Sequence, residues 1–137
     1  MSEATIIQPK IEDVFGVVRG IKPTASMQNF KGMTKSVRVD FDGGRYSFDL
    51  FLDHGGETLT FYGEVGFPYA GFATFAGSWN NHEVIGPLIT LVDGYALKFD
   101  VNISHGAMKA TLEDVIKAFY DAFGKLVAHR QDKQKET

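Results

Sequence analysis

The chain has 137 residues, 44% of them hydrophobic and 23% charged, and its 14 Lys and Arg against 17 Asp and Glu leave a formal net charge of −3. This balance excludes a disordered or fibrous chain and predicts one domain over residues 1–137, with a core from about residue 9 to 130. The absence of cysteine excludes disulfides and thiolate chemistry, and no basic block suits nucleic acid.

The first nine residues lack a basic segment followed by an apolar one, and about 18 apolar residues never run together. We therefore expect no membrane partner and a cytoplasmic location.

The first predicted helix has Pro9 in its first turn, where the missing N–H of proline is not needed, and it ends near Gly20. Its buried stripe has the i, i+3, i+4, i+7 spacing and consists of Ile11, Val14, Phe15 and Val18. From Lys22 to Lys35 the chain is polar and aperiodic, which predicts a loop with at most a short edge strand.

Between Ser36 and Val65 apolar and polar residues alternate, which predicts strands. A turn at Gly43-Gly44 would join the first two strands. On one face it would pair Val37 with Leu50, Val39 with Phe48 and Phe41 with Tyr46. On the other face it would pair the opposite charges Arg38 with Asp49 and Asp42 with Arg45. A second turn at residues 53–56 would add a third strand, with Leu50 opposite Leu59 and Phe48 opposite Phe61.

A middle helix is predicted from one shared face of Phe72, Phe75, Ala76 and Trp79, and Gly86-Pro87 would end it. A hairpin around Asp93-Gly94 would follow, with strands at residues 88–92 and 95–103 and Leu88 opposite Phe99.

The last helix would start at a Thr111 cap and keep helical spacing of apolar residues to Val127, with a frayed tail over residues 131–137. The order is α-β-β-β-α-β-β-α. It predicts an α+β two-layer sandwich in which three helices share one face of an antiparallel sheet of about five strands.

No catalytic, cofactor-binding or metal-binding residue is predicted. None of the histidines, at positions 54, 82, 105 and 129, has a metal-ligand partner at helical or hairpin spacing. Phosphate-binding glycine motifs are absent too, as is the G-x-S-x-G elbow of hydrolases. We expect a protein that is not an enzyme.

Apolar residues on the outward side of the predicted strands are the main functional signal. Ile89 and Leu91 point away from the helices, and Phe51 and Tyr62 lie on the same outer face. A contiguous exposed apolar patch would indicate a surface for a partner protein or for a homodimer. The alternatives are that the segment Lys22 to Lys35 covers these residues or that they are scattered.

The chain has several features typical of one family: its order of elements, the residues Ser78-Trp79-Asn80, Asp93-Gly94 and Asp100, and the long end helix. In these features it resembles the YbjN-type bacterial sensory transduction regulators. The resemblance implies a fold like that of class I type III secretion chaperones and a protein that holds or regulates another protein. The chain departs from the family pattern at residues 81–83, where basic residues are usual, and at His105-Gly106-Ala107, where Gly-Gly is usual.

The first hypothesis is therefore a non-enzymatic protein-binding module, chaperone-like or regulatory, that uses Phe51, Tyr62, Ile89 and Leu91. An alternative is a small-ligand-binding protein with a pocket near Trp79, His82 and His105. A nucleic-acid regulator, which the family's label suggests, is disfavoured by the acidic balance.

Overall fold

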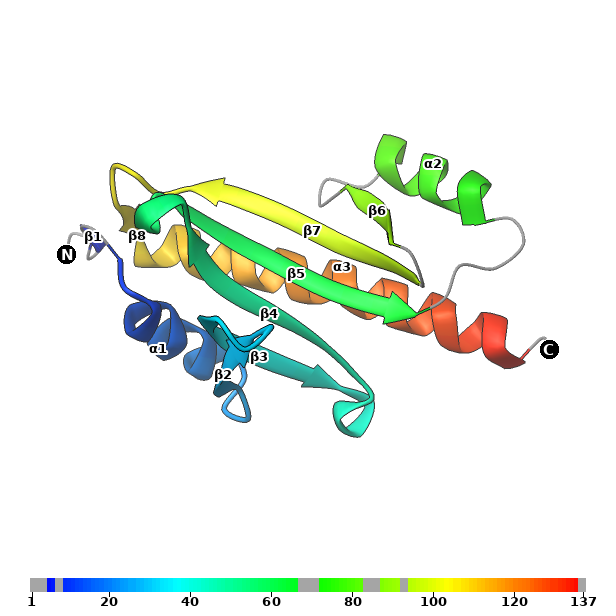
Figure 1. Cartoon of the computed structure of the whole chain (residues 1–137), viewed down its shortest axis with the longest axis horizontal. Helices are drawn as coiled ribbons and strands as arrows, with labels where there is room; N and C mark the ends of the chain where they lie inside the picture. The colour runs from blue at the N-terminus through cyan, green and yellow to red at the C-terminus, as the bar shows by residue number, and fades with distance from the viewer. Residues whose placement is uncertain (1–4, 7–8, 67–71, 83–86, 92–93, 136–137) are drawn as a thin grey trace.

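The computed structural model describes residues 5–6, 9–66, 72–82, 87–91 and 94–135, and of residues 5–6, 72–73, 82, 90–91 and 133–135 it describes the backbone alone. It contains a six-stranded antiparallel sheet against helices, which confirms the predicted α+β sandwich (Figure 1). The sheet strands are β2 (Ser26–Phe30), β3 (Thr34–Phe41), β4 (Tyr46–Asp53), β5 (Thr58–Gly66), β6 (Leu88–Leu91) and β7 (Gly94–Asn102), side by side in the order β2-β3-β4-β5-β7-β6.

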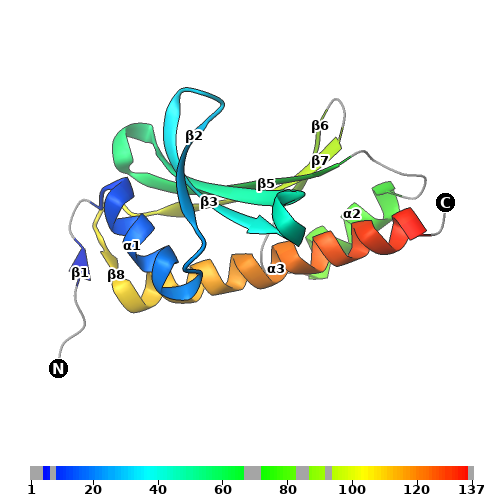
Figure 2. The same ribbon diagram turned by 90° about the horizontal axis from the view of Figure 1, so that it is seen from below.

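The helices are α1 (Ile11–Ile21), α2 (Phe72–His82) and α3 (Lys109–Lys135). Figure 2 shows α1 and α3 against one face of the sheet, while β2 rises from the other, which we call the outer face. Two short strands, β1 (Thr5–Ile6) and β8 (Ala107–Met108), pair with each other apart from the main sheet.

α1 begins at Ile11 with Lys10 as its N-cap, so Pro9 precedes the helix and does not lie in its first turn as predicted. The side chain of Asp13 accepts a hydrogen bond of 2.9 Å from the backbone N–H of Lys10, which closes the first turn next to Pro9. Val14 and Val18 are fully buried, as the stripe required.

The predicted pairing of β3 with β4 is confirmed at each position described. Val37 lies opposite Leu50, and Arg38 lies opposite Asp49. The turn differs in detail, because positive φ begins at Asp42 and continues through Gly43 and Gly44. Only glycine adopts such angles at little cost, so the two glycines allow this tight connection.

The predicted register of β4 with β5 is wrong by two residues. Leu50 lies opposite Phe61, and Leu52, not Leu50, lies opposite Leu59. The cause is the turn over residues 54–57, which repeats the first turn and places Asp53 opposite Thr58 rather than opposite Gly56. A shift of two keeps every side chain on its expected face, so the apolar pattern survived the error.

The predicted register of β6 with β7 is also wrong by two residues, because Leu88 pairs with Leu97 and not with Phe99. Gly94 belongs to β7 rather than to the turn, and Asp93 lies outside the described residues. A Cβ at Gly94 would overlap the carbonyl oxygen of Gly66 on β5. Glycine is required there by the close approach of two backbones.

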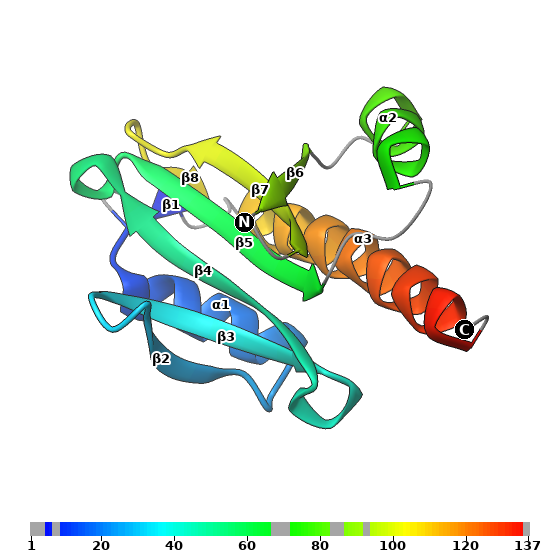
Figure 3. The same cartoon turned by 45° about the vertical axis from the view of Figure 1, so that its right-hand side comes forward.

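The core lies between the sheet and α3, where rings from both layers meet. The ring centroid of Phe119 lies 4.8 Å from that of Phe48 and 5.0 Å from that of Phe61. α2 lies beside the C-terminal half of α3 (Figure 3), where Phe75 stacks on His129 with ring centroids 3.9 Å apart.

α3 is longer than predicted at both ends. It starts two residues before the expected Thr111 cap and continues through the segment expected to fray, as far as Lys135. The segment Lys22 to Lys35 contains the regular edge strand β2, which pairs with β3 along its whole length.

Candidate functional site

Three of the four predicted contact residues lie on the outer face with described side chains. Phe51 and Tyr62 come from the central strands β4 and β5, and Ile89 comes from the edge strand β6; all three are half-buried. The backbone of Leu91 pairs with Gly94, but its side chain lies outside the described residues.

Phe30, at the end of β2, packs on two of them. Its ring centroid lies 4.5 Å from that of Phe51 and 5.3 Å from that of Tyr62. The segment Lys22 to Lys35 thus covers part of the predicted surface, which was one of the two alternatives to an open patch. Phe30, Phe51 and Tyr62 together form what we call the aromatic cluster, and each of its residues is half-buried.

Ile89 is separate from the aromatic cluster. It lies opposite Ala96, and two strand spacings, about 10 Å, separate β6 from β5, which carries Tyr62. Lys98 lies directly opposite Tyr62, and Glu64 lies opposite Ala96. Charged residues therefore interrupt the apolar surface between the aromatic cluster and Ile89.

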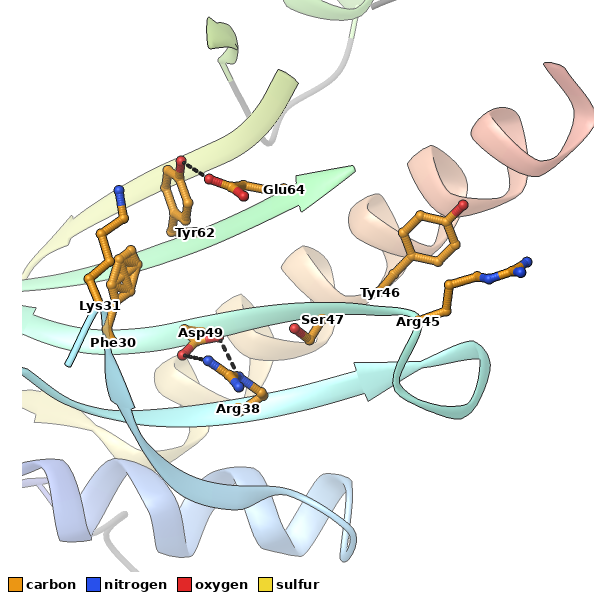
Figure 4. Close-up of a pocket in the computed structure, with 9 residues that line it drawn as sticks. All are labelled: Phe30, Lys31, Arg38, Arg45, Tyr46, Ser47, Asp49, Tyr62 and Glu64. Carbon is orange, nitrogen blue, oxygen red and sulfur yellow. Dashed lines mark hydrogen bonds and ion pairs between the residues drawn. The ribbon is translucent and has the colours of Figure 1, made fainter. Parts of the chain in front are cut away.

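A cleft of about 320 Å³ lies beside the aromatic cluster (Figure 4). Its lining comes from the end of β2, from β3, from the turn before β4, and from β4 and β5. The lining residues are Phe30, Lys31, Arg38, Arg45, Tyr46, Ser47, Asp49, Tyr62 and Glu64.

The floor of the cleft contains an ion pair. Arg38 donates from Nε to Oδ1 of Asp49 at 3.0 Å and from Nη2 to Oδ2 at 3.2 Å, and the buried Ser36 hydroxyl donates to the same Oδ2 at 2.7 Å. The hydrogen bond to Asp49 raises the pKa of Arg38, against the opposing effect of burial. Both carboxylate oxygens of Asp49 are thus engaged within the protein.

Tyr62 forms a wall of the cleft. Its hydroxyl donates a hydrogen bond of 2.9 Å to Oε1 of Glu64. Burial, this hydrogen bond and the charge of Glu64 raise the pKa of Tyr62 to about 12. The phenol therefore stays protonated at neutral pH and holds the Glu64 carboxylate.

Lys31 places its ammonium nitrogen against the rings of the aromatic cluster, 5.4 Å from the Phe30 centroid and 5.7 Å from the Tyr62 centroid. Lys31 has a positive φ of 51° in the turn after β2, and this turn brings the side chain over the rings. At the other end, the Arg45 side chain is 68% exposed and lies 3.9 Å from Asp42.

Sequence reasoning identified part of this site. It placed Arg38 and Asp49 on the outer face in the correct β3 to β4 register, and it placed Tyr62 on the same face although the β4 to β5 register was wrong. It missed Phe30 and Lys31, because the folding of β2 over the outer face has no short-range signal. It placed Arg45 on the outer face opposite Asp42 but did not identify Arg45 or Ser47 as part of a cleft. The one available signal was Phe30 itself, an aromatic residue in an otherwise polar stretch.

The structure gives little support to the alternative hypothesis of a ligand pocket near Trp79 and His82. Trp79 is buried, with its ring centroid 6.0 Å from that of Phe75, and it lines neither the cleft nor a second cavity of about 490 Å³ between α1 and α3. His105 is exposed in the connection between β7 and β8, and the side chain of His82 lies outside the described residues. Within the described ranges no His, Asp or Glu side chains gather in a group that could hold a metal ion.

Comparison with known proteins returned no matching family model, no matching curated protein and no matching solved structure. Among the described residues, no helix has both the length and the apolar content needed to cross a membrane.

Proposed function

We propose that the protein is a non-enzymatic, cytoplasmic protein-binding module, chaperone-like or regulatory as in the YbjN-type proteins it resembles. Its partner docks on the outer face of the sheet. The observation that carries this proposal is the aromatic cluster of Phe30, Phe51 and Tyr62, which is only partly buried on the face opposite α1 and α3.

The cluster has the features of an interface centre. Aromatic residues and arginine are enriched in such centres, and here Phe30 and Tyr62 line the same cleft as Arg38 and Arg45. Ile89 extends the contact toward β6, beyond Lys98 and Glu64. The partner is thus expected to cover two apolar areas with a polar strip between them.

The edge strand β6 is a poor site for adding a partner strand. It has four residues, and the side chain of Asn80 accepts a hydrogen bond of 2.9 Å from the backbone N–H of its first residue, Leu88. We therefore place the contact on the face of the sheet rather than along this edge. A homodimer through the same face is the other form of the proposal.

The test is replacement of Ile89 by Lys. Losing an apolar anchor from an interface costs on the order of 2 kcal/mol, so capture of the partner from the native host, or self-association measured by light scattering, should weaken about thirtyfold. The far-ultraviolet circular dichroism should not change. Leu91→Lys is the second variant.

The matched control is Met108→Lys, which places the same charge at an exposed apolar residue in β8. If Phe51→Lys in the aromatic cluster, Ile89→Lys and Leu91→Lys all bind and elute like the parent and Met108→Lys proteins, the outer face is not the contact surface. A small molecule that co-purifies in stoichiometric amount, with no protein partner, would favour the ligand-binding alternative.

A further inference from the structure

The carboxylates in the cleft are already hydrogen-bonded, but much of its positive charge is still exposed to solvent. Asp49 accepts from Arg38 and Ser36, and Glu64 accepts from Tyr62. The lining contains three cations, Lys31, Arg38 and Arg45, against these two anions. The cleft therefore offers donors to a ligand more readily than acceptors.

The exposed donors are spread along the length of the cleft. Figure 4 shows the ammonium of Lys31 at one end of the cleft, the guanidinium of Arg45 at the other, and the hydroxyl of Ser47 between them. The Lys31 ammonium contacts the faces of two rings, and the Arg45 guanidinium lies 3.9 Å from the Asp42 carboxylate. Neither contact is a short ion pair. A carboxylate that enters the cleft at either end could accept a hydrogen bond from the cation there without breaking the Arg38–Asp49 pair.

We propose that the cleft binds an acidic side chain of the partner protein, next to an apolar side chain of the same segment that packs on the aromatic cluster. This inference rests on the proposed function and specifies its partner as an acidic, apolar peptide segment. A free small carboxylate would leave the partly buried rings beside the cleft uncovered, and for this reason we favour a peptide.

Charge also argues against a second copy of this chain at the cleft. A two-fold dimer centred there would bring the same surface of each copy face to face, so the cation-rich lining of one copy would oppose the cation-rich lining of the other. The partner at the cleft is therefore a different protein.

The experiment measures binding of two short synthetic peptides to the full chain by nuclear magnetic resonance. One is acetyl-Ser-Glu-Phe-Glu-Ser-amide, and the other has Gln in place of both Glu. We expect shifts in the side-chain resonances of Arg38, Arg45 and Lys31 with the Glu peptide. The Gln peptide should bind about fivefold more weakly, and salt at about 1 M, where the Debye length is about 3 Å, should remove the difference.

Arg45→Gln should weaken binding of the Glu peptide about threefold or more and leave binding of the Gln peptide unchanged. Arg19→Gln is the matched control, since Arg19 is exposed on α1, on the helix side of the sheet. Binding of glutarate tests whether the ligand is a free small carboxylate and not a peptide. If glutarate binds as tightly as the Glu peptide, the peptide assignment is wrong.

Equal binding of both peptides, or no binding of either at millimolar concentration, overturns the proposed acidic-segment site. This failure can be told apart from failure of the proposed function. If Ile89→Lys still abolishes capture of a partner, the outer face remains the contact surface and only the chemistry assigned to the cleft is wrong.

Discussion

Asp49 shows how a polar residue on the outer face becomes part of the interior. Alternation alone places it opposite Arg38, as expected for an exposed charge pair on a strand. In the structure Asp49 is buried, with Arg38 and the buried Ser36 as its donors. An ion pair in such a position stabilises only through good geometry, and the two-point contact of the guanidinium meets that condition.

Tyr62 leads to a prediction about alkaline pH. Its folded-state pKa of about 12 lies above the ordinary value of 10.0, so the folded state holds the phenolic proton more tightly than the unfolded chain does. The resulting stability is complete below about pH 10 and is lost as the pH rises through about 12. Denaturant unfolding of the parent and of Tyr62→Phe at rising pH should show a steeper alkaline loss in the parent.

An ultraviolet absorbance titration checks the assignment, because Tyr62→Phe should remove the ionisation at about pH 12. Glu64→Gln should lower the pKa of Tyr62 without returning it to 10.0, since burial is the largest cause of the shift. A titration unchanged by either substitution would contradict the contact between Tyr62 and Glu64.

At the scale of elements, the packing of α3 on β5 depends on a glycine. A Cβ at Gly63 would overlap the ring of Phe123 and lie 2.8 Å from Cβ of Phe48. Sequence alone shows only a glycine inside a strand, which is ordinarily unfavourable. The helix can approach the sheet closely because this position has no side chain.

Gly63→Ala should therefore destabilise the protein by about 1–3 kcal/mol, the usual cost of overpacking a core. Thermal or denaturant unfolding measures it, and Phe123→Leu in the same chain should recover part of the loss. The control is Gly16→Ala, where the added methyl meets open space on α1 and should stabilise by up to about 1 kcal/mol. Equal effects of the two alanines would refute this explanation of the glycine.

The two glycine turns show why element boundaries were harder to predict than faces. Residues 42–45 and 54–57 each contain Gly-Gly and take nearly the same backbone angles, with φ of 67° at Gly43 and 68° at Gly55. The sequence pattern allows the strands to resume after the turn at positions that differ by two residues. Because such positions share a face, alternation cannot distinguish them.

At the scale of the whole molecule, one core joins both layers. Phe119 on α3 contacts Phe48 on β4 and Phe61 on β5, and it is fully buried. Phe119→Ala should cost about 3–5 kcal/mol through lost burial and the cavity that remains. Near- and far-ultraviolet circular dichroism should report one shared, earlier thermal transition, because the sheet and the helix are stabilised by the same contacts.

Lys117→Ala on the exposed side of the same helix is the control, and its effect should stay within about 0.5 kcal/mol. Separate transitions of sheet and helix in Phe119→Ala would show that the two layers unfold independently.

The outer face is asymmetric at this scale as well. α1 and α3 cover one side of the sheet, and on the other side β2 folds over Phe51 and Tyr62 and leaves a cleft next to them. The proposed contact surface is thus smaller than the strand pattern suggested. It is centred on the aromatic cluster and no longer on the run from Leu88 to Val92.

The sequence by itself determined the fold class, the faces of the strands and the register of β3 with β4, because side-chain periodicity and paired charges are local properties of the chain. Only the tertiary structure decided the strand order with β5 beside β7, the burial of Asp49 and the cleft below Lys31. Each of these brings together residues far apart in sequence, whose contacts depend on how elements pack rather than on any pattern within one element.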